Sequence, residues 1–495
     1  MSRWTESPGL LPAAARARRR ALSGCALLLA AVLGGCVTGP NFVAPSEPSP
    51  SRYTAAALTH LPASEQSSPA TSTAAATQPW WTALNAPRLD ATIREALEHN
   101  RDLAAARATL GQMQALAAAS QGAQWPRLDL DASAGREKYG AAFLGSEQLP
   151  PFSFYSVGFG VSYLFDFAGG IRRTVEEQRA LAISQQHQVE AAALSLSGNV
   201  ALQALIAASA RAQITSVEAL LEDDQTNLRL VQGAFEAGSA NRVDVLNAQS
   251  QRANDQTLLP PLRRALSNAE HALALLVGRA PAEWTAPDFK LDEVTLPPEL
   301  PRALPAELAH RRPDILEAEA QLHAATAAVG IAMANLYPQI SLTATASLQS
   351  TALHALFDSN STAAGLTGSL TQPLFDHGAL RARERAAREA MRASLASYEQ
   401  VVLRSFGQVA DALEALDHDA ELLASEQAAV TVSGENLALT RDSYRAGNTG
   451  VLQVLEAQRQ SQQARLGLVR AQAQRNEDTV ELLLALGGQM PAPAY

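Results

Sequence analysis

A stretch of 15 residues occurs twice in this chain and constrains its fold more than any other feature. Residues 235–249 read FEAGSANRVDVLNAQ and residues 444–458 read YRAGNTGVLQVLEAQ, with an aromatic residue, Ala-Gly, Val-Leu and Ala-Gln at the same internal spacing. Gly238 and Gly447 therefore occupy equivalent places. Glycine at such a place commonly adopts the left-handed conformation that ends one helix before the next begins. Each copy predicts the tip of a helical hairpin.

The helices that enter these tips share a seven-residue hydrophobic period. In steps of seven back from each tip, every position is apolar: Phe235, Leu228, Leu221, Ile214, Ala207 and Val200 in the first copy, and Tyr444, Leu437, Val430, Leu423, Leu416 and Val409 in the second. A period held this long predicts coiled-coil packing. Without proline to interrupt them, the helices are expected to run from about 170 to 237 and from about 378 to 446, each roughly 100 Å long.

Between the helices, the hydrophobic period changes to two. Four segments alternate apolar with small or polar residues, which is typical of half-buried strands: 128–134, 155–163, 340–348 and 364–370. Both Trp125-Pro126 and Tyr337-Pro338 stand just before such a segment. The chain is thus expected to repeat one order twice, namely helix, strand, strand, long helix, tip and helix. A proline pair, Pro260-Pro261, should interrupt the first returning helix.

Four such strands have one apolar and one polar face, which limits how they can meet a membrane. A membrane barrel needs at least about eight strands, because open edges leave backbone groups unsatisfied in lipid. One chain therefore cannot close a barrel, but several copies could, with apolar side chains outward. The alternative is a soluble sheet of two hairpins. The fold class expected here is an α+β membrane protein with internal duplication.

The N-terminus resembles a bacterial lipoprotein signal. Basic residues around Arg18 precede the apolar run 25–33, which ends at Gly34-Gly35-Cys36. Leu-Gly-Gly-Cys resembles a lipobox, which implies cleavage before Cys36 and lipid on its thiol. The alternative is an ordinary cleaved signal with a chance cysteine. The expected organisation is a signal peptide at 1–35, a lipidated tether at 36–79, a first repeat at 80–289, a linker at 290–303 and a second repeat at 304–490.

Composition and motifs argue against other functions. The net charge of −10 disfavours nucleic-acid binding, which needs a basic surface. The nine histidines are scattered and no catalytic or phosphate-binding motif occurs, so the chain is not expected to be an enzyme. Asp417-His418-Asp419 is interpreted as a solvated polar face rather than a metal site. No cofactor is expected beyond the covalent lipid on Cys36.

Taken together, these features resemble the TolC-like outer membrane factors, and GPNFVAP at 39–45 resembles their NodT-type lipoprotein branch. The resemblance covers nearly all of 36–488. It implies a homotrimer whose strands form a twelve-stranded β-barrel in the outer membrane, continued by a long α-helical barrel in the periplasm. It also implies the exit duct of a tripartite efflux system, docked at Gly238 and Gly447 to a periplasmic adaptor and an inner-membrane transporter. The competing hypotheses are a periplasmic coiled-coil adaptor and a structural lipoprotein.

The resemblance further implies where the duct narrows. In the family, the helix after the second tip carries the periplasmic constriction, with an acidic residue at the position of Glu456. The candidate gate residues on this helix and its counterpart are Leu452, Gln453, Glu456, Arg459, Asp244 and Asn247. Gln453 stands where some relatives have an acidic residue, which favours closure by Leu452 packing over ion pairs. The alternative is that Glu456 is a solvated residue paired with Arg459.

Overall fold

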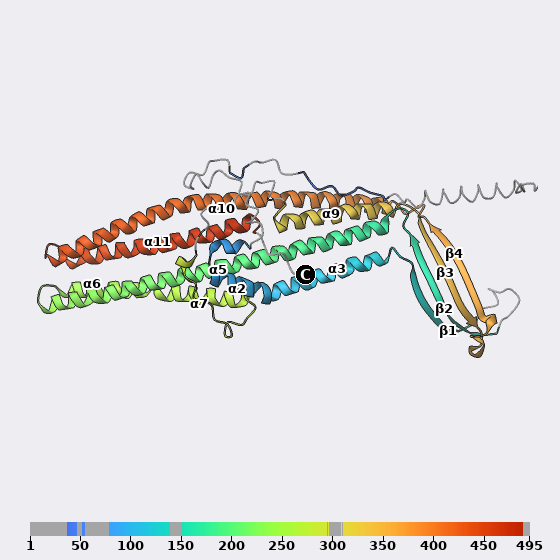
Figure 1. Cartoon of the computed structure of the whole chain (residues 1–495), viewed down its shortest axis with the longest axis horizontal. Coiled ribbons are helices and arrows are strands. Elements are labelled where there is room, and N and C mark those ends of the chain that lie inside the picture. The colour runs from blue at the N-terminus through green and yellow to red at the C-terminus, as the bar shows by residue number, and fades with distance from the viewer. Residues whose placement is uncertain are drawn as a thin grey trace, which may run out of the picture. The chain divides into compact units, whose positions relative to one another are not determined.

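The computed structural model describes residues 37–46, 52–54, 79–138, 150–294, 296, 308 and 310–488. These residues divide into two compact units. The first, called here the sheet unit, contains the described residues up to Ala44 together with Gly111–Ile183 and Glu319–Ala396. The second, the hairpin unit, contains the remaining described residues. Figure 1 shows the elements of both units.

The element order follows the predicted duplication. Both long helices, α5 (Gly170–Glu236) and α10 (Ala379–Arg445), contain 67 residues, and their observed ends lie within one residue of the expected ones. Helices α3, α5, α9 and α10 each contribute residues to both units. The other main elements are α2 (Pro87–His99), α3 (Arg101–Gly122), β1 (Arg127–Glu137), β2 (Phe152–Phe165), α6 (Arg242–Gln256), α7 (Leu259–Leu276), α9 (Pro313–Ala334), β3 (Gln339–Ser350), β4 (Thr362–Thr371) and α11 (Val451–Ala485).

The four strands form one antiparallel sheet in the order β1-β2-β3-β4 (Figure 1). The register places apolar residues opposite one another across the sheet: Leu130 faces Phe159, and Phe159 faces Ala346. This apolar face is exposed, with Leu130 65% and Leu366 74% accessible. Strands β1 and β4 each pair on one side only among the described residues. The predicted open sheet with an apolar face is therefore present.

The opposite face of the sheet is polar. Asp129 and Asp131 on β1 and Thr343 and Ser347 on β3 lie on this face. Gly158 of β2 also belongs here, where an added Cβ would lie 2.3 Å from the Cβ of Ser347. Only glycine tolerates so close an approach of two strands. Strand packing thus explains the first glycine of the Gly-Phe-Gly sequence in β2.

The core of the hairpin unit gathers around the first helices of the chain. Trp80 and Trp81 meet edge to face, with ring centroids 6.0 Å apart. The indole N–H of Trp80 donates to the Ser197 hydroxyl at 3.0 Å, and that of Trp81 donates to the Asp90 carboxylate at 2.7 Å. The surrounding core includes Leu84, Ile93, Val200, Leu205 and Leu273, none more than 1% exposed. Buried aromatic groups with satisfied N–H donors fix where the chain enters this unit.

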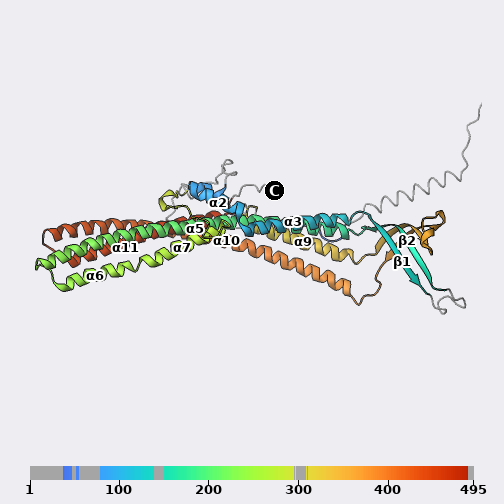
Figure 2. The same cartoon turned by 90° about the horizontal axis from the view of Figure 1, so that it is seen from below.

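About half of the predicted seam positions are buried in the hairpin unit, and most of the others are partly buried. Val200 and Val409 are fully buried, whereas Phe235 next to the first tip is 41% exposed. The first returning helix is interrupted, as predicted, between α6 and α7 (Figure 2). Pro260 and Pro261 lie in the first turn of α7, where a missing N–H costs no helical hydrogen bond. Helix α11 has no proline and continues unbroken for 35 residues.

Candidate functional site

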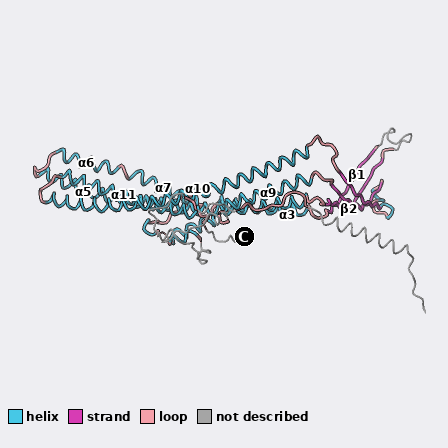
Figure 3. The backbone as a smooth tube through the Cα atoms, turned by 90° about the horizontal axis from the view of Figure 1, so that it is seen from above, coloured by secondary structure: helices cyan, strands magenta, loops and turns pink. Residues whose placement is uncertain are grey.

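Both helical hairpins end in the same turn (Figure 3). Gly238 has φ of 77° and Gly447 has φ of 76°, which confirms the predicted left-handed conformation. The following N–H groups close the turns: Ser239 donates to the Ala234 carbonyl at 2.9 Å, and Asn448 to the Ser443 carbonyl at 2.9 Å. Neither glycine has a heavy atom within 4 Å of where a Cβ would lie. Backbone geometry, not crowding, therefore requires glycine at both tips.

The helices that leave the tips begin differently. At the start of α6, Asn241 and Asp244 form a capping box: the Asn241 side chain accepts from the Asp244 N–H, and the Asp244 carboxylate accepts from the Asn241 N–H, both at 3.0 Å. Helix α11 begins after Gly450 without a side-chain cap. Asp244, one of the predicted gate residues, thus has a structural role in holding the first tip.

The predicted gate residues of α11 share one exposed face of that helix. Leu452 is 50% exposed, and Gln453, Glu456 and Arg459 are exposed with it. The opposite face is buried through Val454, Ala457 and Gln458. A leucine at a helix tip that its own chain leaves exposed is free to contact another molecule.

Glu456 is paired on this face. Arg459 donates to both of its carboxylate oxygens, at 2.6 and 3.1 Å, and the Gln460 amide donates at 3.0 Å. The hydrogen bond from Arg459 lowers the pKa of Glu456, so this carboxylate is ionised at neutral pH. The pairing with Arg459 that the alternative interpretation expected is therefore present, and it leaves Glu456 on the same exposed face as Leu452.

The first hairpin packs against the second near the tips. Leu228 and Val231 of α5 and Val245 and Ala248 of α6 form a buried cluster that Val451 and Leu455 of α11 cover. On α6, Asp244 is half-buried and Asn247 is exposed. The six predicted gate residues thus lie on two neighbouring helices. Within the described ranges, no hydrogen bond joins the α6 pair to those on α11.

A buried hydrogen bond between α5 and α11 was not predicted. The Asn227 amide donates to the side-chain oxygen of Gln458, and both residues are buried, at 8% and 2% exposure. The Gln458 amide nitrogen has no partner among the described residues. The repeated Ala-Gln of the tip sequence was the available signal, but its first copy, Gln249, is exposed. The two copies of this motif therefore differ in role.

Each hairpin also holds one pair of neighbouring carboxyl groups. Asp224 of α5 lies beside Asp255 of α6, and Asp419 of α10 lies beside Asp478 of α11. Burial raises the pKa of Asp224 to about 7, and the Asp255 carboxyl adds to this shift. Burial and the Asp478 carboxyl likewise raise the pKa of Asp419 to about 7. A shared proton would satisfy one buried oxygen of each pair that otherwise lacks a partner.

The interpretation of Asp417-His418-Asp419 as a solvated polar face is wrong. Asp417 and Asp419 are only 6% and 7% exposed, because this part of α10 packs against α11. His418 alone is exposed. Across the part of the chain that the structure describes, no three His, Cys, Asp or Glu side chains gather where they could hold a metal ion.

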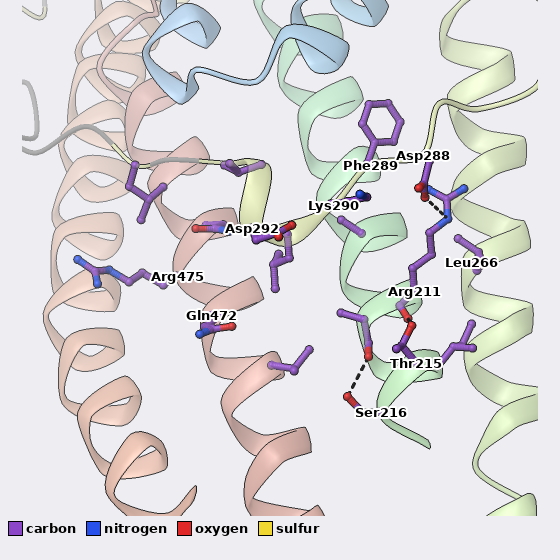
Figure 4. Close-up of a pocket in the computed structure, with 18 of the residues that line it drawn as sticks. Arg211, Thr215, Ser216, Leu266, Asp288, Phe289, Lys290, Asp292, Gln472 and Arg475 are labelled. Atoms are coloured by element: carbon purple, nitrogen blue, oxygen red, sulfur yellow. Dashed lines mark hydrogen bonds and ion pairs between the residues drawn. The ribbon is translucent and has the colours of Figure 1, made fainter. Parts of the chain in front are cut away.

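A cavity of about 850 Å³ lies in the hairpin unit between α5, α7, α11 and the segment after α7 (Figure 4). Arg211 lies in the wall of this cavity. It donates to Glu270 at 2.6 Å and to the Pro287 carbonyl at 3.2 Å, and it forms an ion pair with Asp288 at 3.5 Å. These partners lie on separate elements. The arginine therefore braces the segment after α7 against the helices.

The chain is similar to known proteins in both sequence and structure. The family described as outer membrane efflux protein matches residues 92–279 and 304–488. The chain is 31% identical over 415 residues to the pyoverdine export outer membrane protein OpmQ of Pseudomonas aeruginosa, covering 83% of this chain and 87% of that protein. It is 28% identical to the probable outer membrane lipoprotein SilC of Salmonella typhimurium, covering 92% and 96%. Among solved structures, the outer-membrane channel OprN matches with a TM-score of 0.83 and 28% identity, over 92% of this chain and 99% of that one.

Proposed function

This chain belongs to the outer membrane efflux protein family, and on that premise we propose that three copies of it assemble into one continuous duct. The chain is an outer-membrane channel of an efflux system. The family consists of efflux channels, and we infer that this member conducts passively, without chemistry of its own. Its α+β fold contains the amphipathic sheet that a purely structural coiled coil would lack.

The proposal of a three-chain assembly rests on the open, amphipathic sheet. Its apolar face is exposed across all four strands, and its outer strands β1 and β4 each have one unpaired edge within the described ranges. Lipid cannot satisfy the backbone groups of such edges, so β1 of one copy pairs with β4 of the next. Three copies supply twelve strands and close the barrel.

Native mass spectrometry of the detergent-extracted protein tests this assembly. The expected species has three times the mass of the mature chain. A monomer or dimer as the largest specific species would contradict the proposal.

The helical tips support docking to a periplasmic adaptor and, with it, an inner-membrane transporter. Both tips are exposed and uncrowded, which suits a repeated contact with a partner of matching symmetry. A photoreactive residue at Ser239 in whole cells should form an adduct with a periplasmic protein. The same residue at Phe357, which is 77% exposed in the loop between β3 and β4, is the control and should not capture that protein.

We further propose that the exposed face of α11 lines the narrowest part of the duct. Leu452 and Glu456 lie one helical turn apart on this face, so three copies around an axis would stack a ring of leucines beside a ring of carboxylates. Arg459 pairs with each carboxylate within its own chain, which offsets part of the repulsion between copies but leaves an acidic ring that attracts cations. Closure then rests chiefly on Leu452 packing.

Lipidation of Cys36 is proposed on the lipobox sequence. Cys36 lies outside the described residues, as do the signal peptide at 1–35 and much of the tether at 36–79. The intact mass of the purified chain tests the proposal: the mature protein should begin at residue 36 and carry acyl groups. A chain that begins earlier, or that lacks lipid, would contradict it.

A further inference from the structure

The segment that follows Cys36 is held firmly against other elements of the sheet unit. Both the N–H and the hydroxyl of Thr38 donate to the Ala168 carbonyl, at 3.1 and 2.8 Å. Val37 covers Gly169, where an added Cβ would lie 2.9 Å from the Val37 Cα. Residues 37–42, called here the strap, therefore dock on the short connection between β2 and α5.

Arg173 of α5 is the centre of this contact. Its side chain is only 3% exposed. It donates to the carbonyls of Thr38 and Gly39 at 3.2 and 3.3 Å and to the Asn41 side chain at 2.8 Å. Its remaining partner is Glu176, at 2.7 Å. A buried guanidinium needs its donors satisfied, so the strap supplies most of what allows Arg173 to be buried.

The strap also contacts α9, which belongs to the second repeat. Gly39 has φ of 92°, and an added Cβ there would lie 2.5 Å from the Gly330 Cα, so the two backbones touch. The Phe42 ring stacks on His323, with centroids 4.4 Å apart and planes at 14°. His323 in turn lies 2.9 Å from Glu176. The strap thus bridges α5 and α9, one helix from each repeat.

Arg173, Glu176 and His323 form one hydrogen-bonded network in which Arg173 is buried and the other two side chains are partly exposed. Burial alone would raise the pKa of Glu176, but its hydrogen bonds to His323 and Arg173 outweigh burial and lower the pKa. An ionised Glu176 keeps the Arg173 side chain oriented toward the strap. Strap, α5 and α9 are therefore joined through one set of charges and close backbone contacts.

We propose that the strap is the mechanical link through which the lipid on Cys36 anchors both repeats at the rim of the sheet. Cys36 directly precedes Val37 in the sequence, and Val37 covers Gly169 on the connection that follows β2. The partner of this site is the lipid surface that surrounds the sheet. Arg173 positions the strap, and Gly39 and Gly330 allow the backbone of the strap to lie in contact with α9. This inference rests on the proposed lipidation of Cys36.

A double-mutant cycle tests the link in the full-length protein. The variants are Arg173→Gln, Cys36→Ala exported by an ordinary cleaved signal, and both together; Arg179→Gln, exposed on the same helix, is the matched control. The readout is the yield of assembled protein in the outer membrane. Each single change should lower the yield several-fold, the double variant should be no worse than Cys36→Ala, and the control should equal wild type.

Two outcomes overturn the inference. The first is that Arg173→Gln leaves the yield unchanged. The second is that it lowers the yield by the same factor with and without lipid, which is the behaviour of a residue that only supports the fold. If Arg173→Gln does not fold in either background, Asn41→Ala replaces it in the cycle, because it removes one acceptor and leaves Arg173 paired with Glu176.

Failure of the lipidation proposal is recognised separately. An intact mass without acyl groups refutes that proposal and, with it, the anchoring role of the strap. Docking of the strap itself is measured by Thr38→Cys with Ala168→Cys, since Thr38 and Ala168 are joined by two hydrogen bonds. When Arg173 is present, the disulfide between the two new cysteines should form and shift gel mobility without reductant. In the Arg173→Gln background it should not form.

Discussion

Arginine at neighbouring positions of β3 should have opposite consequences. Leu342 lies on the apolar face, between Tyr163 of β2 and Gly368 of β4, and is 46% exposed in the single chain. Thr343 lies on the polar face, between Ser162 and Thr367. The two side chains are one residue apart but point to opposite sides of the sheet.

The free-energy cost of each arginine depends on whether its face of the sheet contacts lipid or water. A charged side chain on the lipid face of a barrel costs about 2–4 kcal/mol near the midplane, less toward the interfaces, whereas substitutions that face the lumen leave the fold largely intact. If Leu342 lies near the midplane, Leu342→Arg should therefore reduce the folding equilibrium constant by roughly thirtyfold or more, at about 1.4 kcal/mol per tenfold. Thr343→Arg should change it far less, because its new charge meets water and hydroxyl groups.

Urea unfolding in lipid vesicles measures both variants. Leu342→Ala and Thr343→Ala are the matched controls, which remove the side chain without adding charge. Equal destabilisation by the two arginines would refute the assignment of the apolar face to lipid.

Three further predictions concern the hairpin unit. Because the pKa values of Asp224 and Asp419 are raised to about 7, the folded state holds protons that the unfolded chain releases, so thermal stability should fall as pH rises from the ordinary aspartate range to about 7. Asp224→Asn with Asp419→Asn should flatten this dependence in melting experiments, while Asp411→Asn at an exposed site should not. Asn227→Ala leaves the buried side-chain oxygen of Gln458 without a donor and should cost about 1–3 kcal/mol in denaturant unfolding, whereas Asn227→Leu with Gln458→Leu should cost less than that. Gly447→Ala should cost about 1–2 kcal/mol through its left-handed backbone, and Gly434→Ala inside α10 should instead stabilise slightly; equal effects would contradict the turn geometry.

The elements of this fold are predictable because each depends on local periodicity. The seven-residue seam and the lack of proline set the ends of α5 and α10, and the tip glycines mark where the helices turn back. Alternation by two, after an aromatic-proline pair, located β1 and β3. The exposed face of α11 also follows from helical spacing, so the gate residues could be placed on one surface.

The contacts between elements were not predictable in the same way. Asn227 meets Gln458, and Asp419 meets Asp478, only because of how far one helix is shifted and rotated along another, which a repeating pattern does not specify. The strap was missed for a different reason. Its Pro- and Ser-rich surroundings predict an extended chain, but its docking depends on a single buried arginine more than 130 residues away. A ring of gate residues depends on a symmetry axis that a single chain does not contain.

Conductance of the purified protein in planar bilayers tests the central claim most directly. If three copies form a duct that narrows at the tip of α11, wild type should conduct poorly and favour cations. Leu452→Ala with Glu456→Ala should raise the conductance and weaken the cation preference, while Glu435→Ala with Leu439→Ala, an exposed Glu and Leu four residues apart on α10, should change neither. A Leu452 and Glu456 double variant indistinguishable from wild type would contradict the gate, and the absence of any channel activity in all of these proteins would contradict the duct itself.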